Sequence, residues 1–133
     1  MNKIRKQILN TKVCEGYTDR DMNKATYALR RRVMKFIYQA KAIVPDLPRV
    51  EVRISDMKNC AGLGWYNTNV IRIDAKHTKE TRSVVLKRIV YHEIGHAVFG
   101  LKHDSKCPVM ESGWTLGFTD DLLDKTLLKW SKK

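Results

Sequence analysis

The segment from His92 to His96, HEIGH, lies inside a run whose apolar residues recur every three or four positions. Such spacing predicts a helix with one apolar face, here over residues 78–99. Two histidines four residues apart on a helix project from the same face, one turn above the other. Any fold of this chain must therefore present both imidazoles at a common point.

A third histidine follows this predicted helix. Gly100 stands where helices often end in a left-handed residue, so the chain can turn back toward His92 and His96. His103 would then complete the three protein ligands that a catalytic zinc ion takes beside one open position. Asp104, one residue later, offers a carboxylate and is the rival third ligand. We expect one Zn²⁺ ion on His92, His96 and His103.

Glu93 directly follows the first of these histidines. It lies too far round the helix to share the metal, but it can reach a water molecule there. Such a carboxylate takes the proton of a water that attacks a carbonyl and passes it to the leaving amine. This is the chemistry that the HExxH spacing indicates, and a closed structural metal site would have no use for that base.

The rest of the chain predicts a small sheet and two more helices. Residues 19–43 carry an apolar stripe at helical spacing, and Thr18 with Asp21 resembles a capping box. Residues 49–56 alternate as a half-buried strand does, and residues 62–74 predict two strand segments around a polar turn. A last helix follows Thr119. The predicted class is α+β: a small twisted mixed sheet with a backing helix, an active-site helix and a C-terminal helix.

The length and composition of the chain limit the number of domains and the kind of protein that it can form. The 133 residues predict a single domain over residues 1–133, of which residues 1–17 could form a flexible extension. No apolar run reaches membrane length and the start lacks a secretory pattern, so we expect a cytoplasmic monomer without membrane contact. Three cysteines, an odd number without a CxxC pair, predict reduced thiols.

The formal net charge of +12 favours approach to polyanions. Its densest run, LRRRVMK at residues 29–35, shows no nucleic-acid-binding pattern of interleaved aromatic residues. The charge therefore indicates an acidic partner or nucleic acid, or else only a solvated helix face.

The segment HEIGHAVFGLKHD followed by CPVM resembles the metzincin clan of zinc peptidases, whose pattern is HExxHxxGxxH/D with a methionine turn. In this resemblance Met110 is the methionine that packs beneath the ligands. Phe99 is an extra residue before Gly100, as in the similar archaemetzincin variant, and a bulge or a longer last turn would absorb it. The resemblance implies a minimal zincin/metzincin-like domain that acts as an endopeptidase on a protein or peptide substrate.

The resemblance also implies where the substrate binds. Residues 62–74 look like the edge strand that pairs with an extended substrate, and there Gly64, Trp65 and Tyr66 could line a pocket. The two aromatic rings could equally be packed inside. Trp114, past the methionine, could form a specificity wall or part of the core. Two alternatives stay open: a basic, nucleic-acid-associated protease similar to Spartan-like proteases, and a non-catalytic metal-bearing binding module.

Overall fold

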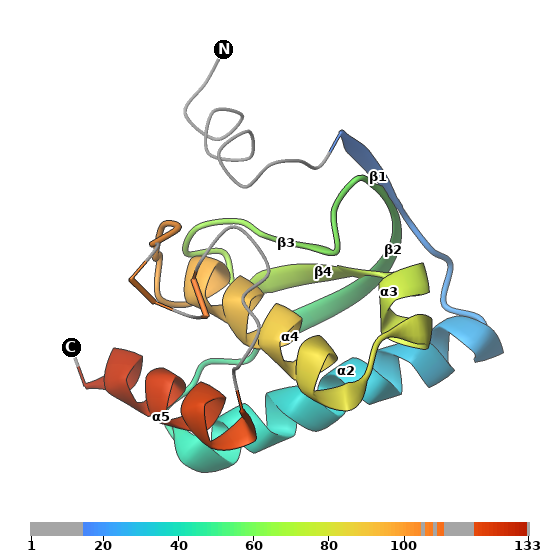
Figure 1. The fold of residues 1–133 in the computed structure, drawn as a ribbon. Coiled ribbons are helices and arrows are strands. Elements are labelled where there is room, and N and C mark those ends of the chain that lie inside the picture. Colours follow the sequence, from blue (N-terminus) through green and yellow to red (C-terminus); the bar gives the residue numbers. More distant parts are fainter. Residues whose placement is uncertain (1–14, 105, 108, 111–118, 133) are drawn as a thin grey trace.

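The computed structural model describes residues 15–104, 106–107, 109–110 and 119–132. Within these residues four strands and four helices form the predicted α+β class (Figure 1). No helix in this part of the chain combines the length and apolar character needed to cross a membrane. In chain order the elements are β1 (Gly16–Asp19), α2 (Lys24–Ile43), β2 (Glu51–Lys58), β3 (Gly62–Gly64), β4 (Val70–Asp74), α3 (Ala75–Glu80), α4 (Ser83–Ala97) and α5 (Asp120–Ser131).

The four strands form one mixed sheet in the order β1-β2-β4-β3. The central strands β2 and β4 are parallel, and both edge strands are antiparallel to their neighbours. The turn between β3 and β4 contains Asn67 and Asn69 at φ angles of 59° and 58°. Asparagine tolerates this left-handed region better than most residues. The predicted pair of strands around a polar turn is therefore confirmed, with β3 at an edge of the sheet.

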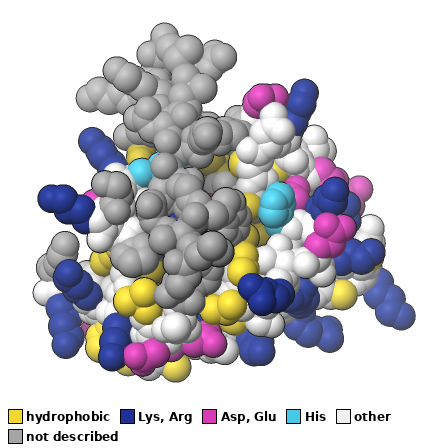
Figure 2. All heavy atoms as spheres, viewed as in Figure 1, with side chains coloured by type: hydrophobic (Ala, Val, Ile, Leu, Met, Phe, Trp, Pro, Cys, Tyr) yellow, Lys and Arg dark blue, Asp and Glu magenta, His cyan; other side chains and the backbone are white. Residues whose placement is uncertain are grey.

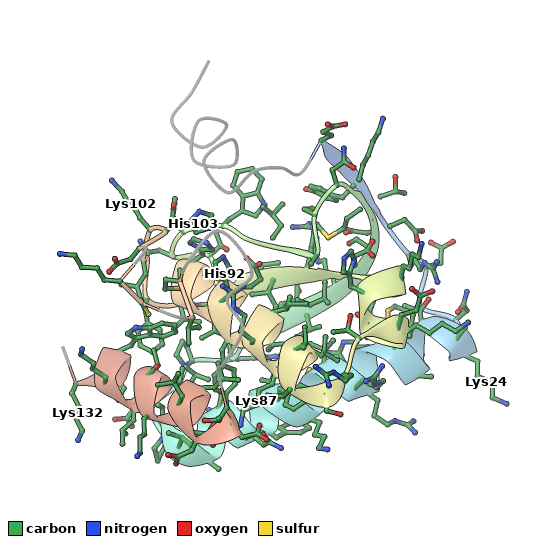
Figure 3. All side chains as sticks on the ribbon, in the orientation of Figure 1. Lys24, Lys87, His92, Lys102, His103 and Lys132 are labelled. Carbon is green, nitrogen blue, oxygen red and sulfur yellow. The ribbon has the colours of Figure 1, made fainter. Side chains whose placement is uncertain are left out.

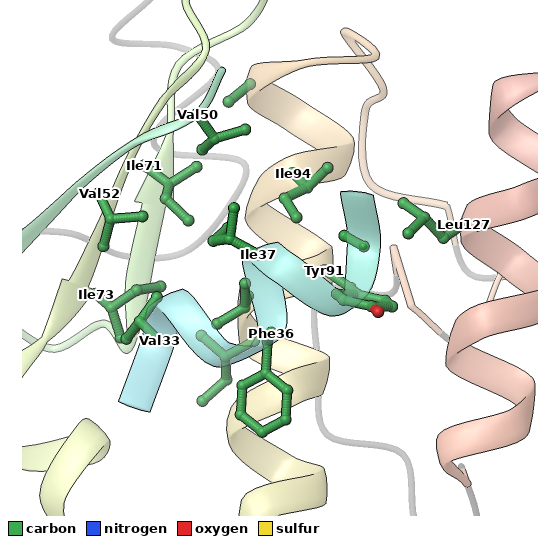
Figure 4. Packing of buried hydrophobic residues seen from close by; sticks show 14 of the residues in the cluster. Val33, Phe36, Ile37, Val50, Val52, Ile71, Ile73, Tyr91, Ile94 and Leu127 are labelled. Atoms are coloured by element: carbon green, nitrogen blue, oxygen red, sulfur yellow. The ribbon is translucent and has the colours of Figure 1, made fainter. Parts of the chain in front are cut away.

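One face of the sheet is apolar and is covered by helices. The parallel register pairs Val52 with Ile71 and Ile54 with Ile73, and all four side chains are buried. Helices α2 and α4 pack on this face and against each other (Figure 4). The core thus lies between the sheet and the helix that carries the histidines.

The opposite face of the sheet is held by a polar contact. Arg72 of β4 is only 8% exposed and donates from Nε to Oδ1 of Asp19 at 2.9 Å. Its guanidinium also lies 4.6 Å from the ring centroid of Tyr17, a cation–π distance. Both partners belong to β1, so Arg72 ties this edge strand across the sheet.

Helix α5 is fixed to α4 by a partly buried polar cluster. Lys87 of α4 is 2% exposed, and its Nζ lies 3.1 Å from Asp120 and 2.9 Å from Asp124. The Tyr91 hydroxyl donates to Asp124 at 3.0 Å. The last helix follows Thr119 as predicted; Thr119 is its N-cap, and Leu123, Leu127 and Trp130 are buried beneath it.

The predicted start of the first helix is wrong. Helix α2 begins at Lys24 and not near Asp19, and its N-cap is Asn23, whose side chain accepts from the Thr26 amide. Thr18 lies instead in β1, opposite Asp56 of β2. The strand pairing outweighs the local capping-box pattern. Residues 16 and 17, placed in the expected N-terminal extension, also belong to β1.

The predicted helix over residues 78–99 is two helices. The chain is extended at Thr81 and Arg82, which separate α3 from α4. The guanidinium of Arg32, far away in the sequence, donates to the carbonyls of Thr78, Lys79 and Thr81. This contact satisfies carbonyl groups at the end of α3 and stabilises the break.

The expectation of three reduced thiols is also wrong. Cys60 is disulfide-bonded, whereas Cys107 is a free thiol. An odd number of cysteines excludes complete pairing, but it leaves room for one bridge. The bond partner of Cys60 lies outside the described residues.

Candidate metal centre

Three imidazole rings converge at the end of α4 and in the loop after it. Nε2 of His92 lies 3.1 Å from Nε2 of His103 and 3.2 Å from Nε2 of His96. The three candidate ligand atoms lie within 4.8 Å of one another. Figure 3 shows His92 and His103 side by side although they come from different segments. These residues could hold a metal ion.

The structure brings His103, and not Asp104, to the pair on α4. The Asp104 carboxylate accepts from the backbone amide of Lys106 at 2.9 Å, within its own loop. The backbone amide of Asp104 donates to the carbonyl of Met110 at 3.0 Å and closes that loop. Asp104 therefore shapes the loop, and the carboxylate has no place in the histidine cluster.

Backbone carbonyls orient the two buried rings. Nδ1 of His92 lies 2.6 Å from the Val109 carbonyl oxygen, and Nδ1 of His96 lies 2.6 Å from that of Leu101. A carbonyl can only accept, so each Nδ1 carries the proton and each Nε2 keeps a free lone pair. Such a contact on the far nitrogen fixes the tautomer of metal-binding histidines.

The surroundings keep these imidazoles neutral. Burial, followed by the charge of His96, lowers the pKa of His92 well below its ordinary value. Burial also lowers the pKa of His96 to about 4, against the opposing effect of its bond to Leu101. A ligating imidazole must be unprotonated, so this donor set suits a divalent ion that prefers nitrogen ligands, such as Zn²⁺.

The extra residue before Gly100 is absorbed by a widened last turn of α4. The Ile94 carbonyl accepts from Val98 at 2.9 Å and also from Phe99 at 3.4 Å, an i→i−5 contact of the π type. Gly100 has a φ of 65°, and the amide of Leu101 then reaches back to Gly95 at 2.9 Å. The ring of Phe99 lies 5.8 Å from that of Trp130 on α5. The predicted bulge and glycine turn are thus both present.

The turn between β3 and β4 caps this end of α4. Asn67 donates from its amide to the carbonyl of His96 at 3.4 Å, and Asn69 donates to Ala97 at 3.1 Å. A Cβ atom on Gly100 would lie 2.8 Å from Oδ1 of Asn67. The sheet therefore satisfies carbonyls that the helix end leaves free, and it fixes the point where the chain turns toward His103.

Met110 packs directly against the helix between the two histidines. The Met110 side chain is 1% exposed, and a Cβ atom on Gly95 would lie 2.4 Å from its Sδ. Trp130 closes the same space from α5, at 3.1 Å from that position. Gly95 is the sequence signal for this contact. A glycine inside a helix costs about 1 kcal/mol relative to alanine, so its presence indicates a position without space for a side chain.

Glu93 is buried beside the histidines and against β3. A Cβ atom on Gly62 would lie 2.9 Å from Oε2 of Glu93, and one on Gly64 would lie 2.5 Å from its carbonyl oxygen. Burial raises the pKa of Glu93 to about 8, opposed by the charge of Arg88 and a hydrogen bond from the Gly64 backbone. Sequence reasoning missed Gly62, although glycines two residues apart on a strand indicate close backbone approach on one face.

Of the residues expected to line a substrate pocket, Tyr66 contacts a histidine of the cluster. Its ring meets that of His96 edge-on, with centroids 5.4 Å apart. Burial and the charge of Glu93 raise the pKa of Tyr66, so its hydroxyl keeps its proton. Trp65 is half-buried beside it, and Trp114 lies outside the described residues.

Comparison with known proteins gives one family and no individual relative. Residues 26–109, more than half of the chain, match the SprT-like family. No curated protein and no solved structure gave a match. The matched range contains most of α2, the whole of β2, β3 and β4, and all three histidines with Glu93. The chain belongs to the SprT-like family, which is related to zincin-like metallopeptidases.

Proposed function

We propose that the protein is a zinc-dependent endopeptidase in which His92, His96 and His103 hold the ion and Glu93 is the general base. One observation carries the proposal: three Nε2 atoms converge, and a buried carboxylate lies on the same helix beside them. A structural metal site needs no such carboxylate. The family match supports a metallopeptidase of this general kind.

The donor set favours zinc among divalent ions. Three neutral imidazole nitrogens leave one position open, which is the arrangement of catalytic zinc sites. When bound there, Zn²⁺ supplies a Lewis acid that polarises a carbonyl and lowers the pKa of water to about 7. The contacts of His92 to Val109 and of His96 to Leu101 hold both rings ready for this ion.

Glu93 supplies the proton transfers. Its carboxylate takes a proton from the attacking water and gives it to the amine that leaves. The hydrogen bond from the Gly64 backbone and the closeness of Gly62 limit where this side chain can lie. A base held in one place by strand β3 needs little reorganisation during the reaction.

Strand β3 is the proposed binding edge for the substrate. It is an edge strand, and an extended peptide could add to it by main-chain hydrogen bonds. Such pairing along Gly64 would place a peptide bond near Glu93, because Gly64 lies against that residue. Tyr66, edge-on to His96, is then the side chain that a bound peptide would meet beside the metal.

Two features support a metzincin-like version of this site within the SprT-like family. Gly100 turns the chain at a positive φ so that His103 reaches the metal position, and Met110 is packed under the helix at Gly95. The alternative is a site similar to that of Spartan-like proteases. The two versions share His92, His96 and Glu93 of the HExxH helix.

The test is Glu93→Gln in the full chain. We expect about one zinc per protein by mass spectrometry of the metal in both wild type and variant. Cleavage of an unfolded protein such as casein should fall by about 100-fold or more, because general base catalysis contributes about 10²–10⁴. Asp104→Asn, which removes a nearby carboxylate outside the cluster, is the control and should remain active. Zinc-loaded wild type that cleaves neither casein nor a peptide library would overturn the proposal.

A further inference from the structure

Helix α2 carries positive charge and no negative charge. Its 20 residues contain six lysines and arginines and no aspartate or glutamate. The helix lies along an outer side of the molecule, with Lys24 at one end (Figures 1 and 3). Lysine and arginine side chains also ring the edge of the face seen in Figure 2. An outer helix without any compensating acidic residue is a strong local source of positive potential.

The outward side of α2 forms a groove. Its volume is about 460 Å³, and its residues recur at spacings of three and four, which places them on one face of the helix. The opposite face, with Val33, Ile37 and Ala40, is buried in the core. The groove is lined by Tyr27, Arg30, Arg31, Met34, Lys35 and Tyr38.

Two exposed tyrosines lie at the ends of this groove. Tyr27 is 53% exposed and Tyr38 is 67% exposed, among the most exposed large apolar side chains described. Met34 is half-buried between them. From Tyr27 to Tyr38 the helix rises about 17 Å, enough to meet about three turns of a partner helix. These rings flank the arginine run instead of alternating with it, so the sequence does not reveal them as part of one surface.

The cations of the groove divide into those used by the fold and those that face solvent. Arg30 donates to the carbonyl of Val52. Arg32, outside the groove, holds the end of α3. Arg31 and Lys35 are exposed, and neither forms an ion pair within the part of the chain that the structure describes. These two side chains can therefore meet an acidic partner without breaking an ion pair of the described residues.

We infer that this face of α2 is a docking surface for an acidic, amphipathic protein segment. An apolar side chain of the partner would lie on Met34 between the two tyrosines, and its carboxylates would meet Arg31 and Lys35. Tyrosine, methionine and arginine are the residues enriched at the centres of protein interfaces, and tyrosine and arginine dominate binding hot spots. The surface lies on a different helix from the histidines and is independent of the proposed peptidase activity.

A nucleic acid and a second copy of the chain fit this groove less well. Nucleic-acid affinity depends on many phosphate contacts, whereas the groove offers Arg31 and Lys35 around the partly buried Met34. A symmetric dimer through this face would bring Arg31 and Lys35 of one copy against the same cations of the other. Like charges facing each other across an interface oppose association.

The experiment selects peptides from a random display library on the immobilised full chain carrying Glu93→Gln. That variant keeps the α2 surface and, if the proposed function is right, prevents cleavage of the library. Selected peptides and a thymidine oligonucleotide are then labelled, and their binding is measured by fluorescence anisotropy. The variants Arg31→Glu and Tyr38→Ala test the surface. Lys129→Glu, an equal charge reversal at an exposed position of α5, is the matched control.

We expect the selected peptides to be acidic with apolar residues at helical spacing. Their affinity should fall by about tenfold or more in Arg31→Glu and in Tyr38→Ala, as at interface hot spots, and stay within about twofold in Lys129→Glu. Three results would overturn the inference: no acidic peptide is enriched, the two groove variants bind the peptides as tightly as the unchanged surface does, or only the oligonucleotide binds and loses affinity in these variants. None of these results depends on whether wild type cleaves casein.

Discussion

Gly64 lies so close to Glu93 that a Cβ atom on the glycine would stand 2.5 Å from the backbone carbonyl oxygen of the glutamate. The neighbouring atom belongs to the main chain of α4, so no side-chain rotation can relieve the contact. This glycine sets the distance between the edge strand and the helix that carries two of the histidines.

Gly64→Ala should therefore push β3 away from α4. We expect a loss of about 1–3 kcal/mol in the free energy of unfolding, the usual cost of an added methyl group without space. The rate at which the protein cleaves casein should fall further than the loss of stability explains. The displaced strand would carry the backbone amide of residue 64 away from Glu93 and break their hydrogen bond. Urea unfolding and casein cleavage at a temperature where the variant is folded measure the two effects. An unfolding curve and a cleavage rate equal to those of wild type would contradict the close contact.

The zinc content of two alanine variants separates the rival third ligands. His103→Ala removes the ring whose Nε2 lies 3.1 Å from His92, and it should weaken zinc binding by well over tenfold. Asp104→Ala removes only the loop contact to Lys106 and should keep about one zinc per chain. Competition with a fluorescent chelator gives both affinities. The reverse order of affinities would reassign the ligand.

Gly95→Ala tests the packing of Met110. The new methyl group would lie 2.4 Å from Sδ of Met110 and 3.1 Å from the ring of Trp130, so we expect a destabilisation of about 1–3 kcal/mol. The double variant Gly95→Ala with Met110→Ala provides space for the methyl group. The double variant should lose less stability than the two single variants lose together, because the effects of substitutions at residues in contact are not additive. Additive losses in thermal unfolding would show that the two side chains do not share this space.

Asp74 gives a prediction for acid stability. Burial alone would raise the pKa of Asp74, but hydrogen bonds from His77 and from the Met57 backbone outweigh it and lower the pKa. The pKa of an aspartate in the unfolded chain is about 3.9. Because the pKa of Asp74 is lower than this in the folded protein, its ionisation stabilises the fold at pH values above the unfolded pKa. This stability is lost as the pH falls through the folded pKa. Asp74→Asn should therefore cost about 1–3 kcal/mol at pH near 7.

The difference between wild type and Asp74→Asn should shrink as the pH falls below about 4. Urea unfolding at neutral and acid pH measures it. Asp46→Asn, at an exposed position, is the control. A difference that stays constant over the whole range would mean that ionisation of Asp74 contributes nothing.

The residues brought together at the metal centre follow from local sequence. His92 and His96 meet because of the helical period, and Gly100 reverses the chain because glycine takes a positive φ at little cost. Both facts are encoded within a few residues, so the sequence predicts the convergence of His103. The position of α5 after Thr119 is predicted for the same reason, since an N-cap acts within the first turn of its helix.

The elements that the sequence predicts wrongly depend on distant contacts. Strand β1 exists because it pairs with β2, and Arg72 holds Asp19 from across the sheet. The break between α3 and α4 is stabilised by Arg32 of α2, and no glycine or proline marks it in the sequence. Periodicity reports which residues are buried and cannot report which partner buries them.

The histidine rings are oriented by the main chain, through the carbonyls of Leu101 and Val109. Every amino acid has such a carbonyl, so the side chains at these two positions are free to change during evolution while the path of the loop is kept. Related proteins could thus share this ligand geometry and yet differ throughout the loop after Gly100. A search for such relatives should compare the course of the backbone from the second histidine to the third, because the letters between them carry little of the constraint.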